Sequence, residues 1–323
     1  MTTRIRAAKG APHARLMGIG AYRPSRVVTN DEICAHIDSS DAWIRERSGI
    51  VTRGVAGPDE SVVDMAAFAG AKALAASGID AEDIGLVLLA TCSMPGPLPG
   101  GSPEVASRLG AKHAGASDIG AGCAGFTYAL SMAADAVRAG SADNVLVVGS
   151  EKLLPLVDPE DRGTAFLFGD GAGAAVVGLA ETDGIGRAAW SHDGAQHARL
   201  VIDGTPQRLK MEGRAIYRWA TASLPDLARR ACELAGITPQ ELAAFVPHQA
   251  NLRITEAVVK SLALPESVVV ARDVVDSGNT SAASVPLALA RLHELGQVRR
   301  GDQILLLGFG AGLTAAGQVV RCP

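Results

Sequence analysis

The chain has 323 residues, of which 48% are hydrophobic and 20% are charged, and its formal net charge is −4. This balance is typical of a globular protein with a large core, and it lacks the basic excess expected of a nucleic-acid-binding protein. No apolar run reaches the ~18 residues of a membrane-spanning helix, so we expect no membrane insertion.

The cysteines and the N-terminal segment both bear on the cellular compartment. The five cysteines are odd in number, widely spaced and form no CxxC pair. This argues against a disulfide framework or zinc site and favours a reducing, cytoplasmic compartment. Residues 1–15 carry four basic and no acidic residues but lack the apolar segment of a secretion signal. We interpret them as a flexible tail, with an organellar transit peptide as the alternative.

Helical and strand patterns alternate from residue 62 onward. We expect helices over 62–77 and 126–139, because their apolar residues recur with helical spacing. LVLLAT at 86–91 and NVLVVGS at 144–150 are short, continuous and apolar, as strands buried on both faces are. DGAGAAVVGL at 170–179 indicates a turn followed by a strand. This alternation predicts an α/β fold with mainly parallel sheets.

The second half of the chain repeats the first. The segment 71–93 matches 229–251, with Gly78 and Gly236 separated by 158 residues (236 − 78). VLVVGS at 145–150 matches ILLLGF at 304–309, with Gly149 and Gly308 separated by 159 (308 − 149). Two matches at nearly the same offset predict a duplicated fold. We therefore expect one half at 16–184 and a second at 185–323, sharing one core.

Cys123 is the candidate nucleophile. It lies in GAGCAGFTYAL, between small residues and the helix expected from residue 126. A helix N-terminus stabilises a thiolate through its dipole and free backbone N–H groups. We expect Cys34, Cys92, Cys232 and Cys322 to be inert structural cysteines instead.

Two polar residues of the second half are candidates to act with Cys123. His248 follows a strand expected at 243–246, and catalytic groups gather beyond the carboxyl ends of parallel strands. Asn279 lies in a Gly-Asn turn of DSGNTSAAS, and the repeat maps the neighbouring Ser281 near Cys123 (281 − 158). A hydrogen-bonded loop histidine and a capping asparagine are the alternatives. GFGAGLTAAG at 308–317 lacks the features of a P-loop, and we interpret it as a tight loop that presents a backbone N–H.

Four segments, GCAGFTYAL, VPHQANLRI, GNTSAAS and FGAGLT, resemble the signatures of the β-ketoacyl-acyl-carrier-protein synthase III family. The likeness continues through GAYRPSRVVTNDEI, SSDAWIRERSGI, DPEDRGTAFLFGDGAGAA and MEGRAIYRWA, and covers residues 16 to 321 in order. HQANLRI with GNTSAAS is specific to this family within the thiolase superfamily. The resemblance implies a duplicated, five-layered αβαβα thiolase-like fold and a homodimer. It also implies a cytoplasmic acyltransferase that uses an acyl-CoA and a malonyl-acyl carrier protein, with no further cofactor and no metal.

The resemblance also implies roles for single residues. Cys123 would accept the acyl primer, and His248 and Asn279 would bind the malonyl thioester carbonyl. The backbone N–H groups of Cys123 and Ala311 would form the oxyanion hole. The remaining expected contacts are for coenzyme A, Trp43, Arg47, Arg162 and Asn251; for the acyl pocket, Leu98 and Tyr217; and for the carrier protein, Arg218, Arg253 and Lys260.

The chain departs from the common family pattern at three places. Segment 191–212 is short, and the loop 94–103, MPGPLPGGSP, is rich in Pro and Gly. In this family that loop reaches the partner's acyl pocket, so Leu98, where some relatives have Phe, either widens that pocket or only packs the dimer interface. Ala311 stands where some relatives have Gly, which leaves its backbone donor unchanged.

The sequence argues against three alternatives to a decarboxylating condensing enzyme. An acyltransferase without condensation would not need Asn279. A degradative thiolase needs a second cysteine in the C-terminal Gly-rich loop, and GFGAGLT has none. A non-catalytic subunit would not need Cys123, His248 and Asn279 together. The segments do not identify the primer, or distinguish fatty-acid initiation from polyketide priming.

Overall fold

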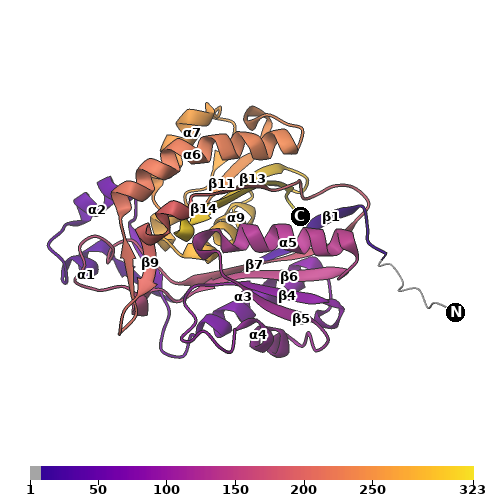
Figure 1. Cartoon of the computed structure of the whole chain (residues 1–323), viewed down its shortest axis with the longest axis horizontal. Coiled ribbons are helices and arrows are strands. Elements are labelled where there is room, and N and C mark those ends of the chain that lie inside the picture. Colours follow the sequence, from indigo (N-terminus) through magenta and orange to yellow (C-terminus); the bar gives the residue numbers. More distant parts are fainter. Residues whose placement is uncertain (1–8) are drawn as a thin grey trace.

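Two five-stranded sheets form the centre of the molecule in the computed structural model, which describes residues 9–323 (Figure 1). The first sheet has the order β1-β7-β6-β4-β5 and the second β12-β11-β13-β14-β8. The strands of the first sheet are β1 (His13–Tyr22), β7 (Gly171–Ala180), β6 (Asn144–Glu151), β4 (Leu86–Ala90) and β5 (Gly115–Ile119). Those of the second are β12 (Val269–Val270), β11 (Ala244–Pro247), β13 (Gln303–Gly310), β14 (Thr314–Arg321) and β8 (Ala189–His192).

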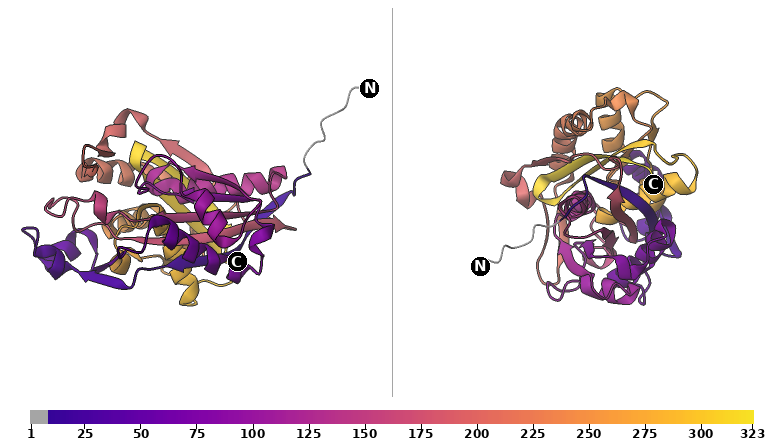
Figure 2. Two further views of the ribbon diagram at one scale, coloured as in Figure 1. Left: turned by 90° about the horizontal axis from the view of Figure 1, so that it is seen from below. Right: turned by 90° about the vertical axis from the view of Figure 1, so that its right-hand side faces the viewer.

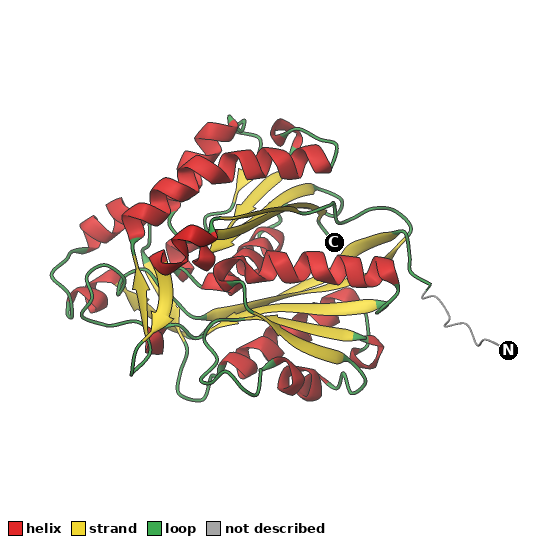
Figure 3. Cartoon of the chain, in the orientation of Figure 1, coloured by secondary structure: helices red, strands yellow, loops and turns green. Residues whose placement is uncertain are grey.

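The helices form three layers around these sheets, which gives the expected five-layered α/β fold (Figures 1 and 3). α5 (Gly125–Ala139) and α9 (Ser284–Glu294) are buried between the sheets. α3 (Val62–Ser77) and α4 (Ser102–Leu109) cover the outer face of the first sheet, and α6 (Gly213–Leu234) and α7 (Leu252–Leu262) that of the second. None of the helices in residues 9–323 combines the length and hydrophobicity needed to cross a bilayer.

Smaller elements gather at one end of the layers, at the left of Figure 1. They include two hairpins, β2 (Arg26–Thr29) with β3 (Thr52–Val55) and β9 (Leu200–Asp203) with β10 (Arg208–Met211). The short helices are α1 (Asn30–Cys34), α2 (Asp41–Ser48) and α8 (Val274–Ser277). The 3-10 helices are distributed over the described chain and do not all lie at this end: η1 (Ala81–Asp83), η2 (Gly122–Ala124), η3 (Leu154–Leu156), η4 (Gly194–Arg199), η5 (Pro239–Glu241), η6 (Ser281–Ala283) and η7 (Ala311–Leu313).

The sequence repeat corresponds to a repeat of strand pairing. Leu86 of β4 pairs with Val145 of β6, and Ala244 of β11, 158 residues later, pairs with Ile304 of β13 (244 − 86; 304 − 145 = 159). Gly78 and Gly236, the pair that first indicated the repeat, both have positive φ at the ends of α3 and α6. Because a left-handed residue favours glycine, this match has a conformational cause.

The expectation of mainly parallel sheets is wrong. Each sheet has two parallel and two antiparallel pairings, with β6–β7 and β13–β14 antiparallel. β13 and β14 are joined by the three residues of η7, which is too short for the helical crossover that a parallel pair requires.

The proposed boundary between residues 184 and 185 falls in the connection from β7 to β8. β1 begins at His13, inside the segment 1–15 that was expected to be a tail, and residues 1–8 of that segment lie outside the described part of the chain. The turned views in Figure 2 show the first half (indigo to magenta) and the second half (orange to yellow) stacked on each other, with no separate lobe for either.

Candidate active site

Cys123 lies in η2, the 3-10 turn that leads directly into the 15-residue helix α5. The preceding Gly122 has φ +51°, a conformation that favours glycine. β13 lies so close that a Cβ on Gly310 would come 2.8 Å from the Cβ of Cys123. Small residues therefore let the nucleophile turn of the first half contact a strand of the second half.

The free Cys123 thiol is not the stabilised thiolate that its helix position suggested. Burial raises the pKa of Cys123 to about 12; the hydroxyl of Ser281 opposes the shift, and the charge of Glu151 adds to it. At neutral pH the sulfur of the free enzyme therefore carries its proton, because burial disfavours the charged thiolate.

His248 follows β11 directly and is buried, with its ring edge-on to Phe309 at 4.9 Å. Its Nδ1 lies 2.6 Å from the hydroxyl oxygen of Ser284, which also accepts the Gln249 backbone N–H at 3.3 Å. If Nδ1 carried the proton, the Ser284 hydroxyl hydrogen would have no acceptor among its described contacts. The arrangement is satisfied when Ser284 donates to Nδ1, which leaves Nε2–H as the free donor of the ring.

The imidazole of His248 is neutral across the physiological range. Burial lowers its pKa to about 3. A neutral ring with its proton on Nε2 can donate a hydrogen bond without adding a charge to the site.

Asn279 lies between α8 and η6, and its amide is oriented by its own turn. Its Oδ1 accepts the backbone N–H of Ser281 at 2.9 Å. Its backbone is fixed as well, because Asn279 N–H donates to the Leu167 carbonyl at 2.8 Å and its carbonyl accepts from Gly169 at 3.0 Å. With the oxygen occupied, the amide NH2 is the group left to donate.

These three side chains line one cavity of about 170 Å³, which we call the inner cavity. Ala311 also lines it, next to Gly122: a Cβ on Gly122 would lie 3.3 Å from the Ala311 nitrogen. Apolar side chains form the rest of the wall, and several come from the segment 191–212 and the start of α6: Leu200, Val201, Ile202, Leu209, Met211 and Ile216.

A second, wider cavity of about 510 Å³ leads outward from the first, and we call it the outer cavity. The two cavities share the wall residues Met211, Ile216, Ala250 and Asn279, so they adjoin each other, and we call the pair the passage. Its other lining residues include Trp43, Arg47, Tyr217, Arg218, Asn251 and Arg253.

Most of the residues expected to contact coenzyme A lie around this passage. The guanidinium groups of Arg47 and Arg162 lie 5.6 and 4.9 Å from the ring centre of Trp43. Asn251 caps α7 through the Arg253 N–H and donates to the Arg47 carbonyl at 3.1 Å. α2, α7 and the loop that carries Arg162 are thereby held together.

The structure brings together only some of the residues expected in the acyl pocket and the docking site. Tyr217 lies in the outer cavity under the guanidinium of Arg253, at 5.5 Å, and not in the inner cavity. Leu98 is 86% exposed in the single chain. Arg218 and Arg253 line the outer cavity, whereas Lys260, seven residues beyond Arg253 on α7, does not.

Sequence reasoning missed the polar cluster behind Cys123. Cys92, expected to be an inert structural cysteine, lines the inner cavity. Its thiol donates to the buried carboxylate of Glu151 at 3.3 Å, and Ser281 donates to the same carboxylate at 2.8 Å. Ser281 is one of three described non-glycine residues with positive φ, at +47°. The matching offset of 159 aligns it with Gly122, and aligns Ala282, not Ser281, with Cys123 (281 − 122; 282 − 123).

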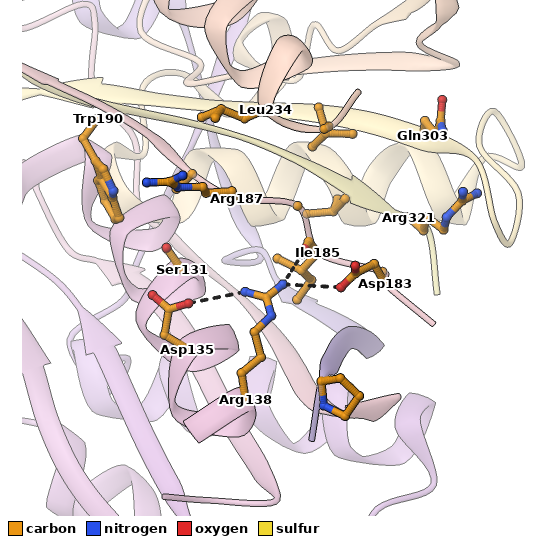
Figure 4. A pocket seen from close by; sticks show the side chains of 17 residues that line it. Ser131, Asp135, Arg138, Asp183, Ile185, Arg187, Trp190, Leu234, Gln303 and Arg321 are labelled. Carbon is orange, nitrogen blue, oxygen red and sulfur yellow. Dashed lines mark hydrogen bonds and ion pairs between the residues drawn. The ribbon is translucent and has the colours of Figure 1, made fainter. Parts of the chain in front are cut away.

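A larger open groove of about 760 Å³ lies away from this site, between the end of α5 and β14 (Figure 4). Its acidic and basic groups largely pair with one another: Arg138 contacts Asp135 at 3.3 Å, Asp183 at 3.8 Å and the Ile185 carbonyl. No cysteine or histidine is among its described lining residues. Within residues 9–323 no group of three or more His, Cys, Asp or Glu side chains could hold a metal ion.

Comparisons with known proteins give a consistent result. Residues 117–194 match the family model for 3-oxoacyl-acyl-carrier-protein synthase III, and residues 232–322 match the model for its C-terminal part. The chain is 48% identical, over 99% of its length and all of the relative, to β-ketoacyl-acyl-carrier-protein synthase III 1 of Streptomyces coelicolor. It is 47% identical, over 99% of its length and 98% of the relative, to the mycobacterial β-ketoacyl-acyl-carrier-protein synthase III of Mycobacterium avium.

Solved structures agree. The priming β-ketosynthase of the R1128 polyketide biosynthetic pathway superposes with a TM-score of 0.96 at 44% identity, covering 100% of this chain and 99% of that one. The 3-oxoacyl-acyl-carrier-protein synthase III of Aquifex aeolicus superposes with a TM-score of 0.91 at 38% identity, covering 96% of this chain and 100% of that one.

Proposed function

Because the chain belongs to the β-ketoacyl-acyl-carrier-protein synthase III family, whose members are acyl-transferring condensing enzymes, we propose that Cys123, His248 and Asn279 catalyse its reaction. The observation that carries this proposal is that three residues from two halves of the chain line one small cavity with a wider cavity adjoining it. The enzyme condenses an acyl primer with a malonyl thioester, in fatty-acid initiation or polyketide priming.

In the first half-reaction Cys123 takes the acyl group of an acyl-CoA. The sulfur forms a bond to the thioester carbon, and the bond from that carbon to the sulfur of coenzyme A breaks. The proton of the Cys123 thiol ends on the departing coenzyme A sulfur, so the step needs no net proton acceptor. Exchange between two thioesters is nearly balanced in energy.

In the second half-reaction a malonyl-acyl carrier protein replaces coenzyme A. Its carboxylate leaves as CO2, and the electron pair of the broken C–C bond forms an enolate on the thioester. The enolate carbon attacks the acyl-Cys123 carbonyl, the C–S bond breaks, and the Cys123 sulfur takes a proton from water. The product is a β-ketoacyl-acyl carrier protein. The cycle balances without a further cofactor, and we propose none.

Neutral donors suit both steps. The Nε2–H of His248 and the amide NH2 of Asn279 would stabilise the enolate oxygen, while the N–H groups of Cys123 and Ala311 would bind the oxygen of the acyl carbonyl under attack. Fixed donors in a water-poor cavity do not have to reorganise when the charge develops. The hydrogen bonds from Ser284 and Ser281 support these directions, because they occupy Nδ1 and Oδ1.

The outer cavity supports a common entrance for both substrates. We propose that Trp43, Arg47, Arg162 and Asn251 bind coenzyme A there, and that Arg218 and Arg253 face the acidic carrier protein at its mouth. We further propose that the active enzyme is a homodimer. Nothing in the site favours the alternative of acyl transfer without condensation.

Replacement of Asn279 by Asp tests the assignment sharply. Asp keeps the oxygen that accepts from Ser281 but exchanges the donating NH2 for a carboxylate oxygen. We expect CO2 release from malonyl-acyl carrier protein to fall by about 10²–10³, the usual effect of losing one oxyanion donor. Self-acylation by acyl-CoA, read as the mass added to the intact protein, should persist in Asn279→Asp and disappear in Cys123→Ser. Equal loss of both half-reactions in folded Asn279→Asp would refute this division of roles.

A further inference from the structure

Glu151, the last residue of β6, is a fully buried carboxylate beside the active site that the reaction does not use. Five oxygen and nitrogen donors surround it. They are the hydroxyls of Thr91 at 3.1 Å, Ser93 at 2.5 Å and Ser281 at 2.8 Å, and the backbone N–H groups of Cys92 at 3.1 Å and Ala282 at 3.4 Å. Burial raises the pKa of Glu151, and these hydrogen bonds oppose the shift. A side chain that only accepts suits such a set of donors.

All of these donors come from two short loops. Residues 91–93 begin the connection that contains the Pro/Gly-rich loop 94–103, and residues 281–282 form the turn after Asn279. Glu151 thus connects two segments of the chain. One lies 130 residues from it in the sequence, and the other lies about 60 residues from it. A residue that only ended a strand would not need hydrogen bonds to two separate loops.

The internal repeat shows that Glu151 occupies a special position. Its counterpart at an offset of 159 is Gly310 (310 − 151), the residue against which Cys123 packs. In the same way η6 packs against β6: a Cβ on Gly149 would come 2.3 Å from the Ala282 carbonyl oxygen. Both turns therefore pack on glycines, but where the nucleophile turn meets Gly310, the turn after Asn279 is hydrogen-bonded to the Glu151 carboxylate.

Ser281 transmits the effect of that carboxylate to Asn279. It holds φ +47°, where its first-half counterpart is Gly122 at +51°, and a non-glycine residue is strained in this left-handed conformation. Its hydroxyl donates to Glu151 and its backbone N–H donates to the Asn279 amide oxygen. The left-handed conformation of Ser281, held by Glu151, thereby fixes which face of the Asn279 amide meets the inner cavity.

We propose that Glu151, acting through Ser281, is a positioning residue that aims the Asn279 amide at the malonyl thioester oxygen. This inference rests on the proposed role of Asn279. It assigns Glu151 to the decarboxylation half-reaction, because its hydrogen bonds hold the second-half turn, while Cys123 lies on the first-half turn against Gly310. Glu151 does not line the inner cavity, whereas Ser281 lines it beside Cys123 and donates its hydroxyl to Glu151.

The experiment compares Glu151→Gln, Ser281→Ala, Ser281→Gly and the double variant Glu151→Gln/Ser281→Ala with wild type. Ser131→Ala is the control, because Ser131 is also a buried serine but lines the separate groove of Figure 4 and not the inner cavity. Each protein is assayed for self-acylation by acyl-CoA and for CO2 release from malonyl-acyl carrier protein, and its thermal unfolding is recorded. We expect CO2 release to fall by about 10- to 100-fold in the single variants, as for a misaimed catalytic group. Acylation should change by less than about threefold, well below that effect.

Two comparisons separate positioning from a loss of stability. The double variant should lose no more CO2 release than Glu151→Gln alone, because both changes break one connection. Ser281→Gly relieves the strain at φ +47° but lacks the hydroxyl, so it should fold as well as wild type and still lose CO2 release.

Several outcomes would overturn the inference. They are wild-type CO2 release in Ser281→Ala, multiplicative losses in the double variant, full activity in Ser281→Gly, and equal loss of acylation and CO2 release in folded protein. A wild-type enzyme that releases no CO2 would overturn the proposed function and this inference together, whereas unchanged variants of an active enzyme overturn this inference alone.

Discussion

The orientation of the two proposed oxyanion donors depends on hydrogen bonds from two neighbouring serines. Ser284 occupies the Nδ1 atom of His248, and the N–H of Ser281 occupies the amide oxygen of Asn279. Each catalytic side chain has one donor and one acceptor end, and the neighbour binds the end that the enolate cannot use. Without these hydrogen bonds, a histidine and an asparagine at the same positions could turn an acceptor atom toward the negative charge that develops on the enolate oxygen.

The buried His248 predicts an unusual pH dependence of CO2 release. Burial lowers its pKa to about 3, so the ring stays neutral from about pH 4 upward. CO2 release by enzyme already acylated should therefore show no inflection near pH 6.5, where an ordinary histidine titrates. A clear rise or fall centred there, absent from the acylation step, would contradict the assigned protonation state.

The same shift has a consequence for folding stability with a definite sign. Between about pH 3 and 6.5 the unfolded chain binds a proton at His248 that the folded chain does not. The contribution of the neutral His248 ring to the free energy of unfolding is thus fully present above about pH 6.5, and it decreases as the pH falls below that value. His248→Gln should flatten this part of the stability curve measured by chemical denaturation, and an unchanged slope would argue against a buried neutral ring.

At the scale of elements, helices α6 and α7 form the mouth of the outer cavity. Arg253 near the start of α7 lies over Tyr217 of α6, whereas Lys260 lies two turns further along α7 and outside the cavity. Arg253→Glu should raise the KM for malonyl-acyl carrier protein and spare acylation by a short acyl-CoA. Lys260→Glu is the matched charge reversal and should have the smaller effect.

Salt provides the second readout of that prediction. The difference between wild type and Arg253→Glu should shrink at high ionic strength, because screening weakens the wild-type attraction as well. Equal KM values for wild type and Arg253→Glu at low salt would remove Arg253 from the docking site. Equal effects of the two reversals would indicate general attraction over the whole face instead.

The loop that carries Arg162 and helix α2 predict a movement on binding coenzyme A. The family resemblance implies that Trp43 and Arg162 sandwich the adenine of coenzyme A. The Arg162 guanidinium lies 4.9 Å from the centre of the Trp43 ring, but an adenine between them needs about 7 Å, two contact distances of ~3.5 Å. Coenzyme A should therefore separate the pair and change the fluorescence of Trp43. A titration in which Trp43→Phe gives the same signal change as wild type would show that the other tryptophans report instead.

In the molecule as a whole, the parts of the fold that depend on short segments of sequence could be predicted. The repeat at offsets of 158 and 159 reflects strand pairs and left-handed glycines that occur in both halves. The antiparallel strands were missed because burial on both faces makes parallel and antiparallel strands look alike. The three-residue connection at 311–313 was the available signal, since it is too short for a crossover.

The candidate site was predictable only where its residues follow recognisable turns. Cys123, His248 and Asn279 each stand in or directly after a turn: Cys123 in η2, His248 after the buried strand β11, and Asn279 between α8 and η6. Glu151 was missed because a charged residue that ends an apolar run usually marks a solvated strand end, and its donors are about 60 and 130 residues away. Ser281 gave no signal either, because positive φ at a serine cannot be read from residue type.

The exposed Leu98 predicts that two copies of the chain assemble. Leu98 is 86% exposed in the single chain, on the Pro/Gly-rich loop that starts at the Glu151 cluster. An exposed leucine between two prolines, held on a restrained loop, fits a contact with another chain better than solvent. We expect a two-chain mass by sedimentation equilibrium, with Leu98 completing the partner's acyl pocket.

Leu98→Phe tests whether that contact sets the choice of primer. A flat, bulkier ring at this position should narrow the accepted primers toward acetyl, whereas wild type should also accept branched or medium chains. A scan of acyl-CoAs, read as the acyl mass on Cys123, measures this directly. Leu295→Phe, which changes an equally simple exposed leucine just after α9, should leave the profile unchanged. If Leu98→Phe remains dimeric with the wild-type chain-length profile, Leu98 packs the interface between chains without lining the pocket, and primer choice must then depend on the apolar wall from the segment 191–212.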